Sequence, residues 1–191
     1  MNLPKSFLFV AIATALLLLV PFVAMRFSTE VNWTGLDFLV AGGLLFGSGV
    51  TFVLIAQKAN STAYRLAVAV AVAAGLLLVW ANMAVGLVGS EDNPVNGLYV
   101  AVLAVALIGA FVARFRPLGM SNAMFAAALT YVAVTMIALF LWKPAGATAE
   151  PQVGLANVLG ANAAFAALWA GAGLLFRRAS ADSANQHRRL A

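Results

Sequence analysis

Six apolar runs, each close to the length that crosses a membrane, constrain this chain more than any other feature of its sequence. A helix needs about 20 mostly apolar residues to span the ~30 Å hydrocarbon core of a bilayer. The runs therefore predict an all-α, polytopic membrane protein, a bundle of six transmembrane helices. The expected helices cover residues 6–25, 36–56, 66–89, 95–115, 122–142 and 155–176.

Composition supports lipid as the solvent of these helices. The chain is 64% hydrophobic and only 9% charged, whereas soluble domains contain about 25% charged residues. Too few charges are present to cover a surface that faces water. The net charge of +5 does not indicate nucleic acid as a partner, because the basic residues lie at the ends of the expected helices and no nucleic-acid-binding fold is recognisable.

The connections between the runs are short, so neighbouring helices are expected to be antiparallel and to form one compact unit. No linker or change of composition marks a second domain. We therefore predict a single transmembrane domain over residues 1–178, followed by a flexible cytoplasmic tail over residues 179–191, which has the polar sequence "ASADSANQHRRLA".

The basic residues predict an orientation. With six spans, nine of the eleven basic residues fall on one side of the membrane, and cytoplasmic loops carry the excess of Lys and Arg. We therefore expect both termini in the cytoplasm of a bacterium, with the chain in the inner membrane. The nine are Lys5, Lys58, Arg65, Arg114, Arg116, Arg177, Arg178, Arg188 and Arg189.

The first run also has features of a signal peptide, since "MNLPKSFLFVAIATALLLLVPFVA" has a basic start and an apolar core. No clear A-x-A cleavage site precedes a polar segment. Retention as a membrane anchor is the expectation, and cleavage would leave five helices with the same later orientation.

The acidic residues admit two interpretations. Thr34 and Asp37 fit a capping box at the start of the second helix. In "SEDNPVN", Pro94 fits the first helical position, with Asn93 or Asp92 as its N-cap. The alternative is an outward-facing cation site made by Glu91 and Asp92, although adjacent carboxylates seldom converge on one ion.

Buried amides are the strongest candidates for a polar site. Asn82, Asn157 and Asn162 are expected in the outer half of the membrane, where an unpaired amide is costly. One interpretation makes them hydrogen-bonding contacts between helices. The other makes them the wall of a polar pocket that opens outward and is roofed by the Glu91–Asn96 turn. The candidate pocket residues are Asn82, Glu91, Asp92, Asn96, Asn157 and Asn162.

Small residues recur at helical spacing. Gly43 and Gly47 lie four apart in the second helix, and Ala167 and Gly171 do so in the sixth. Such strips allow close approach of two backbones. They predict either packing within the bundle or a face that contacts another membrane protein or a second copy of the chain.

Residue types that carry catalysis are scarce. There is no cysteine, and the only histidine, His187, lies in the polar tail. No HExxH, GxSxG, GxGxxG or phosphate-binding Gly-Lys-Ser/Thr pattern occurs. We therefore expect no catalytic residue, no cofactor and no metal. No acid or base lies at mid-membrane depth, which argues against a proton-coupled pump.

The run "WANMAVGLVGSEDNPVN", together with "ARFRPLGM", resembles a pattern found in uncharacterised small bacterial multi-pass membrane proteins. The resemblance covers residues 80–120 and carries a WAN-x-AVG-x-x-GSEDNP-type motif. It implies no activity.

The sequence thus favours a non-catalytic accessory or interaction subunit in contact with the lipid bilayer. The alternative is a small transporter, channel or ligand-binding protein that uses the polar pocket. An intramembrane enzyme that uses Glu91 or Asp92 is the third and least favoured hypothesis.

Overall fold

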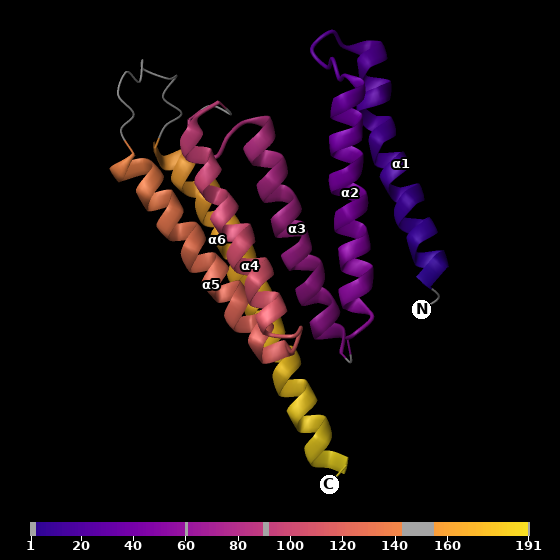
Figure 1. Cartoon of the computed structure of the whole chain (residues 1–191), viewed down its shortest axis with the longest axis vertical. Helices are drawn as coiled ribbons and strands as arrows, with labels where there is room; N and C mark the ends of the chain where they lie inside the picture. Colours follow the sequence, from indigo (N-terminus) through magenta and orange to yellow (C-terminus); the bar gives the residue numbers. More distant parts are fainter. Residues whose placement is uncertain (1–2, 60, 90–91, 143–154, 191) are drawn as a thin grey trace. The chain divides into compact units, whose positions relative to one another are not determined.

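The structure, a computed structural model, describes residues 3–59, 61–89, 92–142 and 155–190 (Figure 1). In this part of the chain six helical segments are long and apolar enough to cross a membrane. The prediction of an all-α fold with six helices that are long and apolar enough to span a membrane is therefore confirmed. The chain divides into two compact units, residues 1–58 and 59–191.

The first unit is a helical hairpin of α1 (Leu3–Phe27) and α2 (Gly35–Ala56). The two helices approach closely where α2 carries glycine: a Cβ at Gly42 would lie 3.2 Å from the Leu18 side chain, and one at Gly49 would overlap Val10. Glycine at these positions therefore permits the hairpin to close.

The start of α2 has the predicted capping box. The Asp37 carboxylate accepts from the Thr34 backbone N–H at 2.6 Å, and the Asp37 N–H donates to Thr34 Oγ1 at 3.3 Å. These bonds satisfy two backbone donors at the helix start. Capping accounts for Asp37 without a ligand.

The second unit contains the other four spans. Its elements are α3 (Thr62–Ala84), the 3₁₀-helix η1 (Pro94–Tyr99), α4 (Val100–Val112), α5 (Pro117–Met136), the π-helical turn η2 (Ile137–Leu141) and α6 (Leu155–Leu190). Helix α6 packs against both α3 and α5, and α4 packs against α5. Figure 1 shows α3 to α6 running roughly alongside one another.

Helix α3 ends earlier than expected, at Ala84. Gly86 and Gly89 follow with φ of 71° and 73°, a left-handed conformation that glycine adopts without strain. The chain then enters η1, where the Asn93 side chain accepts from the Val95 N–H at 3.1 Å and Pro94 occupies the first turn. Asn93 is thus the N-cap, one of the two predicted caps.

Helix α5 also begins differently from the prediction, at Pro117. Ser121 directly precedes the expected start at residue 122, but it lies inside the helix, and its hydroxyl donates to the Gly173 carbonyl of α6 at 2.8 Å. Arg114 and Phe115 form the preceding turn with φ of 49° and 59°. The Phe115 N–H donates to the Ala110 carbonyl at 3.2 Å, a bond that closes the end of α4.

Helix α6 continues as far as Leu190, through residues that the sequence assigns to a tail. Its terminal segment has no Gly or Pro to interrupt a helix. The helical conformation is therefore reasonable for this composition, and the flexibility of the segment stays a prediction.

Large apolar side chains are exposed on the outside of the helices. Phe9, Leu129 and Val112 are 74%, 71% and 79% exposed. Tyr99, Tyr131 and Asn162, in contrast, are among the buried residues of the second unit. A surface of this kind suits contact with lipid chains rather than water.

Candidate polar site between η1, α5 and α6

Asn162 is the centre of the buried polar groups in the second unit. It lies on α6 and is only 3% exposed. Its Oδ1 accepts from the Tyr99 hydroxyl at 2.8 Å and from the Tyr131 hydroxyl at 3.0 Å. Its Nδ2 donates to the carbonyls of Leu87 and Val158 at 3.1 and 2.9 Å. Two acceptor positions and two donor hydrogens are all that a primary amide offers, so this side chain is saturated.

Thr135 completes the group from α5. Its Oγ1 lies 3.0 Å from the Tyr131 carbonyl, 3.0 Å from the Tyr99 hydroxyl and 3.2 Å from Asn162 Oδ1. Both tyrosines donate to Asn162, so the single threonine hydrogen is available for the Tyr131 carbonyl. We call Tyr99, Tyr131, Thr135 and Asn162 the hydroxyl–amide cluster.

Aromatic packing fixes the two phenols. The rings of Tyr99 and Tyr131 are 5.0 Å apart between centroids, and Phe165 of α6 stacks on Tyr131 at 5.8 Å. Both tyrosines are fully buried. The hydroxyl groups are therefore held in place by ring contacts as well as by hydrogen bonds.

A second amide, Asn96 of η1, organises the segment after α3. Its Oδ1 accepts from the N–H groups of Leu87 and Val88, each at 3.0 Å, and its Nδ2 donates to the Val88 carbonyl at 3.2 Å. The Asn96 backbone carbonyl accepts from Asn82 Nδ2 at 3.0 Å. Asn96 thus satisfies backbone groups that no longer belong to a helix.

Leu87 connects the two amides, because its N–H bonds Asn96 and its carbonyl bonds Asn162. Through this residue the end of α3, η1, α5 and α6 share one hydrogen-bonded region. The interpretation of the buried amides as contacts between helices agrees with these bonds.

The structure brings three of the six candidate pocket residues together, Asn82, Asn96 and Asn162. Asp92 and Asn157 are exposed, and Glu91 lies outside the described residues. An outward-opening pocket made by all six stays a prediction.

Sequence reasoning missed the hydroxyl partners Tyr99, Tyr131 and Thr135. The signal was present: Tyr131 and Thr135 are four residues apart in the fifth apolar run, so they share one face of a helix. A buried Asn in one run and a hydroxyl pair in another are complementary groups.

Two buried polar atoms accept or donate no hydrogen bond among the described residues, Asn82 Oδ1 and Trp169 Nε1. Asn82 is half-buried, and Trp169 on α6 is 2% exposed. Unpaired buried groups of this kind are uncommon. Asn82 Oδ1 belongs to the site, because Asn82 Nδ2 donates to the Asn96 carbonyl, and it remains open to a water or a ligand group.

Amides, phenols and one threonine hydroxyl make up the site. Such groups can bond a carbonyl or hydroxyl of a ligand, but at neutral pH they have no charge with which to hold an ion. No group of three or more His, Cys, Asp or Glu side chains that could hold a metal ion occurs within the described ranges.

Comparison with protein-family models finds no match, and comparisons with curated proteins and with solved structures find no significant match. The resemblance to uncharacterised bacterial membrane proteins thus receives no support from these comparisons. On its structure, the chain is an all-α protein with six helices that are long and apolar enough to span a membrane.

Proposed function

We propose that the chain is a non-catalytic accessory subunit of the bacterial inner membrane, which contacts partner membrane proteins through lateral helix faces. Both termini lie in the cytoplasm, because that orientation places most of the basic residues there. The observation that carries the proposal is the saturation of Asn162. Its donors and acceptors bind this chain's own groups, so they stabilise the fold instead of facing a substrate.

The small-residue faces support a role in contacts between proteins. A Cβ at Gly43 or Gly47 of α2 meets no described atom of its own unit within 4 Å, and the same holds for Gly160 and Gly171 of α6. Gly42 and Gly49 are used within the α1–α2 hairpin. The open glycines are therefore available for close approach of another helix.

Photo-cross-linking in the membrane tests this proposal. A photoreactive residue replaces Leu39, which is 72% exposed and lies one turn before Gly43. The control position is Val112 on α4, which is 79% exposed and has no open glycine beside it. We expect one discrete protein adduct from position 39 and lipid adducts from position 112.

The variant Gly43→Leu/Gly47→Leu should remove the protein adduct while the chain still inserts and elutes as a folded species. Protein adducts of equal yield at both positions, or lipid adducts alone at both, would contradict the proposal. Quantitative mass spectrometry of the adduct gives the partner and its stoichiometry, and shows whether that partner is a second copy of the chain.

A small ligand-binding or transport protein is the second candidate, and one observation favours it. Asn82 Oδ1 is a buried acceptor without a described donor. A small polar ligand that bonds it would raise the melting temperature of the protein, and Asn82→Leu would abolish that rise. A set of polar metabolites that shifts neither protein would count against this candidate.

A further inference from the structure

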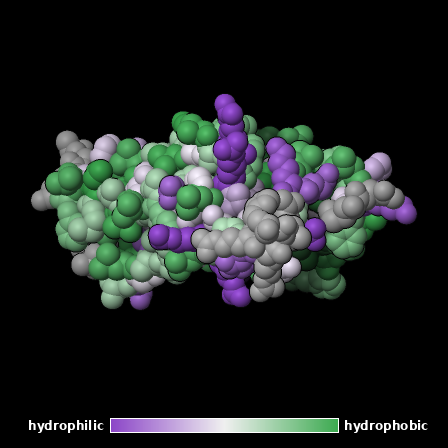
Figure 2. Space-filling view, turned by 90° about the horizontal axis from the view of Figure 1, so that it is seen from below, coloured by the Kyte–Doolittle hydropathy of each residue, from purple (hydrophilic) through white to green (hydrophobic). Residues whose placement is uncertain are grey.

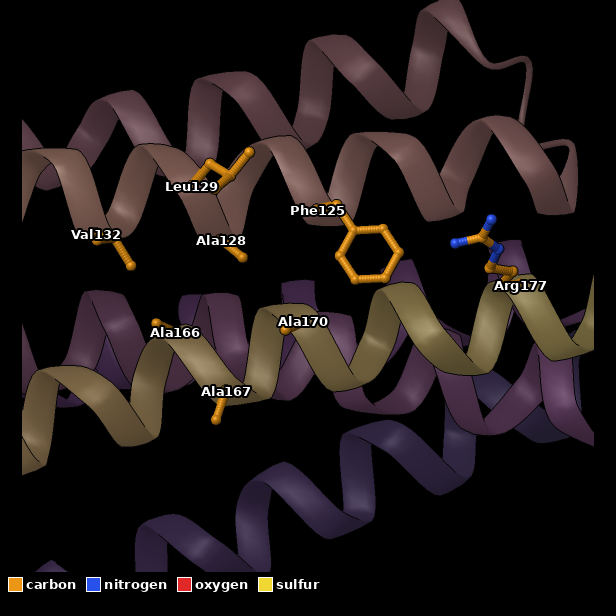
Figure 3. Close-up of a pocket in the computed structure, with 8 residues that line it drawn as sticks. All are labelled: Phe125, Ala128, Leu129, Val132, Ala166, Ala167, Ala170 and Arg177. Atoms are coloured by element: carbon orange, nitrogen blue, oxygen red, sulfur yellow. The ribbon is translucent and has the colours of Figure 1, made fainter.

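A groove of about 590 Å³ runs between α5 and α6 (Figure 3). Its walls are apolar, with Ala128 of α5 facing Ala166 and Ala170 of α6. Phe125 and Arg177 lie at one end. Arg177 is the only charged residue of the lining.

The small side chains make the groove. Alanine has no side chain beyond Cβ, so a run of alanines on α6 leaves open space beside α5. Leu129 and Val132 line the groove on the α5 side, and Leu129 is 71% exposed. The groove therefore opens to the surface that faces lipid.

The end of the second unit at which Arg177 lies is rich in basic residues. The Tyr64 hydroxyl of α3 donates to the Phe115 carbonyl at 2.7 Å, and the Tyr64 ring lies 5.1 Å from that of Phe176. These contacts place Tyr64, Phe115 and Phe176 at the same end of the second unit, together with the residues next to them in the sequence. Those neighbours include Arg65, Arg114, Arg116, Arg177 and Arg178.

Few negative charges offset this basic end. The only acidic residue in the sequence of α6 is Asp182, which lies more than one turn beyond Arg177. Figure 2, a view from this side of the molecule, shows hydrophilic side chains set among apolar ones. The combination suits a ligand with an apolar chain and an anionic head.

The length of the groove matches one leaflet of a bilayer. At a rise of about 1.5 Å per residue, α6 covers about 16 Å between Ala166 and Arg177. Half of a hydrocarbon core of about 30 Å is about 15 Å. A lipid chain that ends at the height of Arg177 would therefore lie along the whole groove.

We propose that this groove binds an acyl chain of an anionic phospholipid, and that Arg177 binds the phosphate of the same lipid. The guanidinium group presents paired donors that match phosphate oxygens. The phenyl ring of Phe125 lines the groove between Ala170 and Arg177 and packs over Gly173, since a Cβ there would be 3.2 Å from that ring. The site takes one anionic phospholipid, and it prefers such a lipid to a zwitterionic one.

Native mass spectrometry tests the proposal on the full chain in nanodiscs that contain equal amounts of phosphatidylglycerol and phosphatidylcholine. We expect the wild-type protein to retain one phosphatidylglycerol molecule after release from the nanodisc. Arg177→Gln should retain about tenfold less, the effect of losing a charge-assisted hydrogen bond.

Arg178→Gln is the matched control. It removes the same charge from the next residue of α6, which does not line the groove. The control should retain the lipid as the wild type does. Equal losses in both variants would show diffuse attraction to basic residues and would overturn the proposal.

A second variant tests the apolar part of the site. Ala170→Phe fills the groove and leaves Arg177 in place, so it should also lose the retained lipid. Circular dichroism and size exclusion verify folding. If this variant does not fold, Ala170→Leu replaces it in the same assay.

Each alternative occupant of the groove would give a different experimental result. Retention of phosphatidylcholine equal to that of phosphatidylglycerol would show that the site does not select an anionic headgroup over a zwitterionic one. Stabilisation of the wild-type protein against unfolding by inorganic phosphate alone, without lipid, would show that the site does not require the acyl chain. A lipid-free dimer that Ala170→Phe dissociates would assign the groove to a second copy of the chain. Each of these outcomes overturns the proposal.

Discussion

Asn162 and Asn157 lie on the same helix, one turn and a half apart, yet their surroundings are opposite. Asn162 is 3% exposed and bonds groups from η1, α5 and the segment after α3. Asn157 is exposed. The pair therefore gives a direct comparison of an amide inside the bundle with one on its surface.

Asn162→Leu should lower the free energy of unfolding by about 2 kcal/mol or more, because it leaves two buried tyrosine hydroxyls without their acceptor. Asn157→Leu should change it by less than about 0.5 kcal/mol, as surface substitutions commonly do. Reversible unfolding in mixed micelles measures both. Similar effects of the two substitutions would contradict the role assigned to the hydroxyl–amide cluster.

Sequence identified Asn162 as a buried amide but not its partners. An Asn in an apolar run must be paired, since hydrocarbon offers no hydrogen bond. Which hydroxyl it meets depends on helix rotation and on the order in which helices pack. Tyr99 lies in a 3₁₀ turn, whose geometry does not follow from the apolar pattern of its run.

At the scale of the helices, the contact of α4 with α5 depends on glycine. A Cβ at Gly109 would lie 2.6 Å from the Cβ of Ala123 and 3.2 Å from its Cα. Neither atom can rotate away, because both are fixed to the backbone. Gly171 of α6, in contrast, has no described atom within 4 Å of such a Cβ.

Gly109→Ala should therefore destabilise the protein by about 1–3 kcal/mol through overpacking. Gly171→Ala should be neutral, or stabilising by up to about 1 kcal/mol, since alanine is the better helix former. Thermal unfolding in detergent gives the sign of each change. Stabilisation of the same size in both variants would show that helix propensity, not packing, sets the result.

Helix ends differ from the apolar runs for local reasons. The fifth run was expected to start at residue 122, but Pro117 begins α5 because proline suits a first turn. The third was expected to reach residue 89, but Gly86 takes a positive φ. Hydropathy locates a span, whereas its ends depend on backbone preferences that hydropathy does not record.

At the scale of the whole chain, the six helices predict that successive connections face opposite sides of the membrane. Gln57 follows α2 and Asp92 precedes η1, so a single span, α3, separates them. Both side chains are exposed. The chain has no cysteine, so one introduced thiol reports one position.

In the orientation that we propose, Asp92→Cys should react with a membrane-impermeant maleimide in intact spheroplasts, and Gln57→Cys should react only after the membrane is opened. The reverse pattern would invert the orientation. Reaction of both thiols from the same side would exclude α3 as a membrane span.

The hydroxyl–amide cluster also restricts how the second unit can move. A shift of α6 by one residue along its axis would displace Asn162 by about 1.5 Å and rotate it by about 100°. That shift would break its bonds to Tyr99, Tyr131 and Leu87 together. Sliding of α6 past α5 is therefore opposed by the hydrogen bonds of one side chain, Asn162. An axial displacement of α6 is therefore coupled to α5 and η1 through the bonds of Asn162.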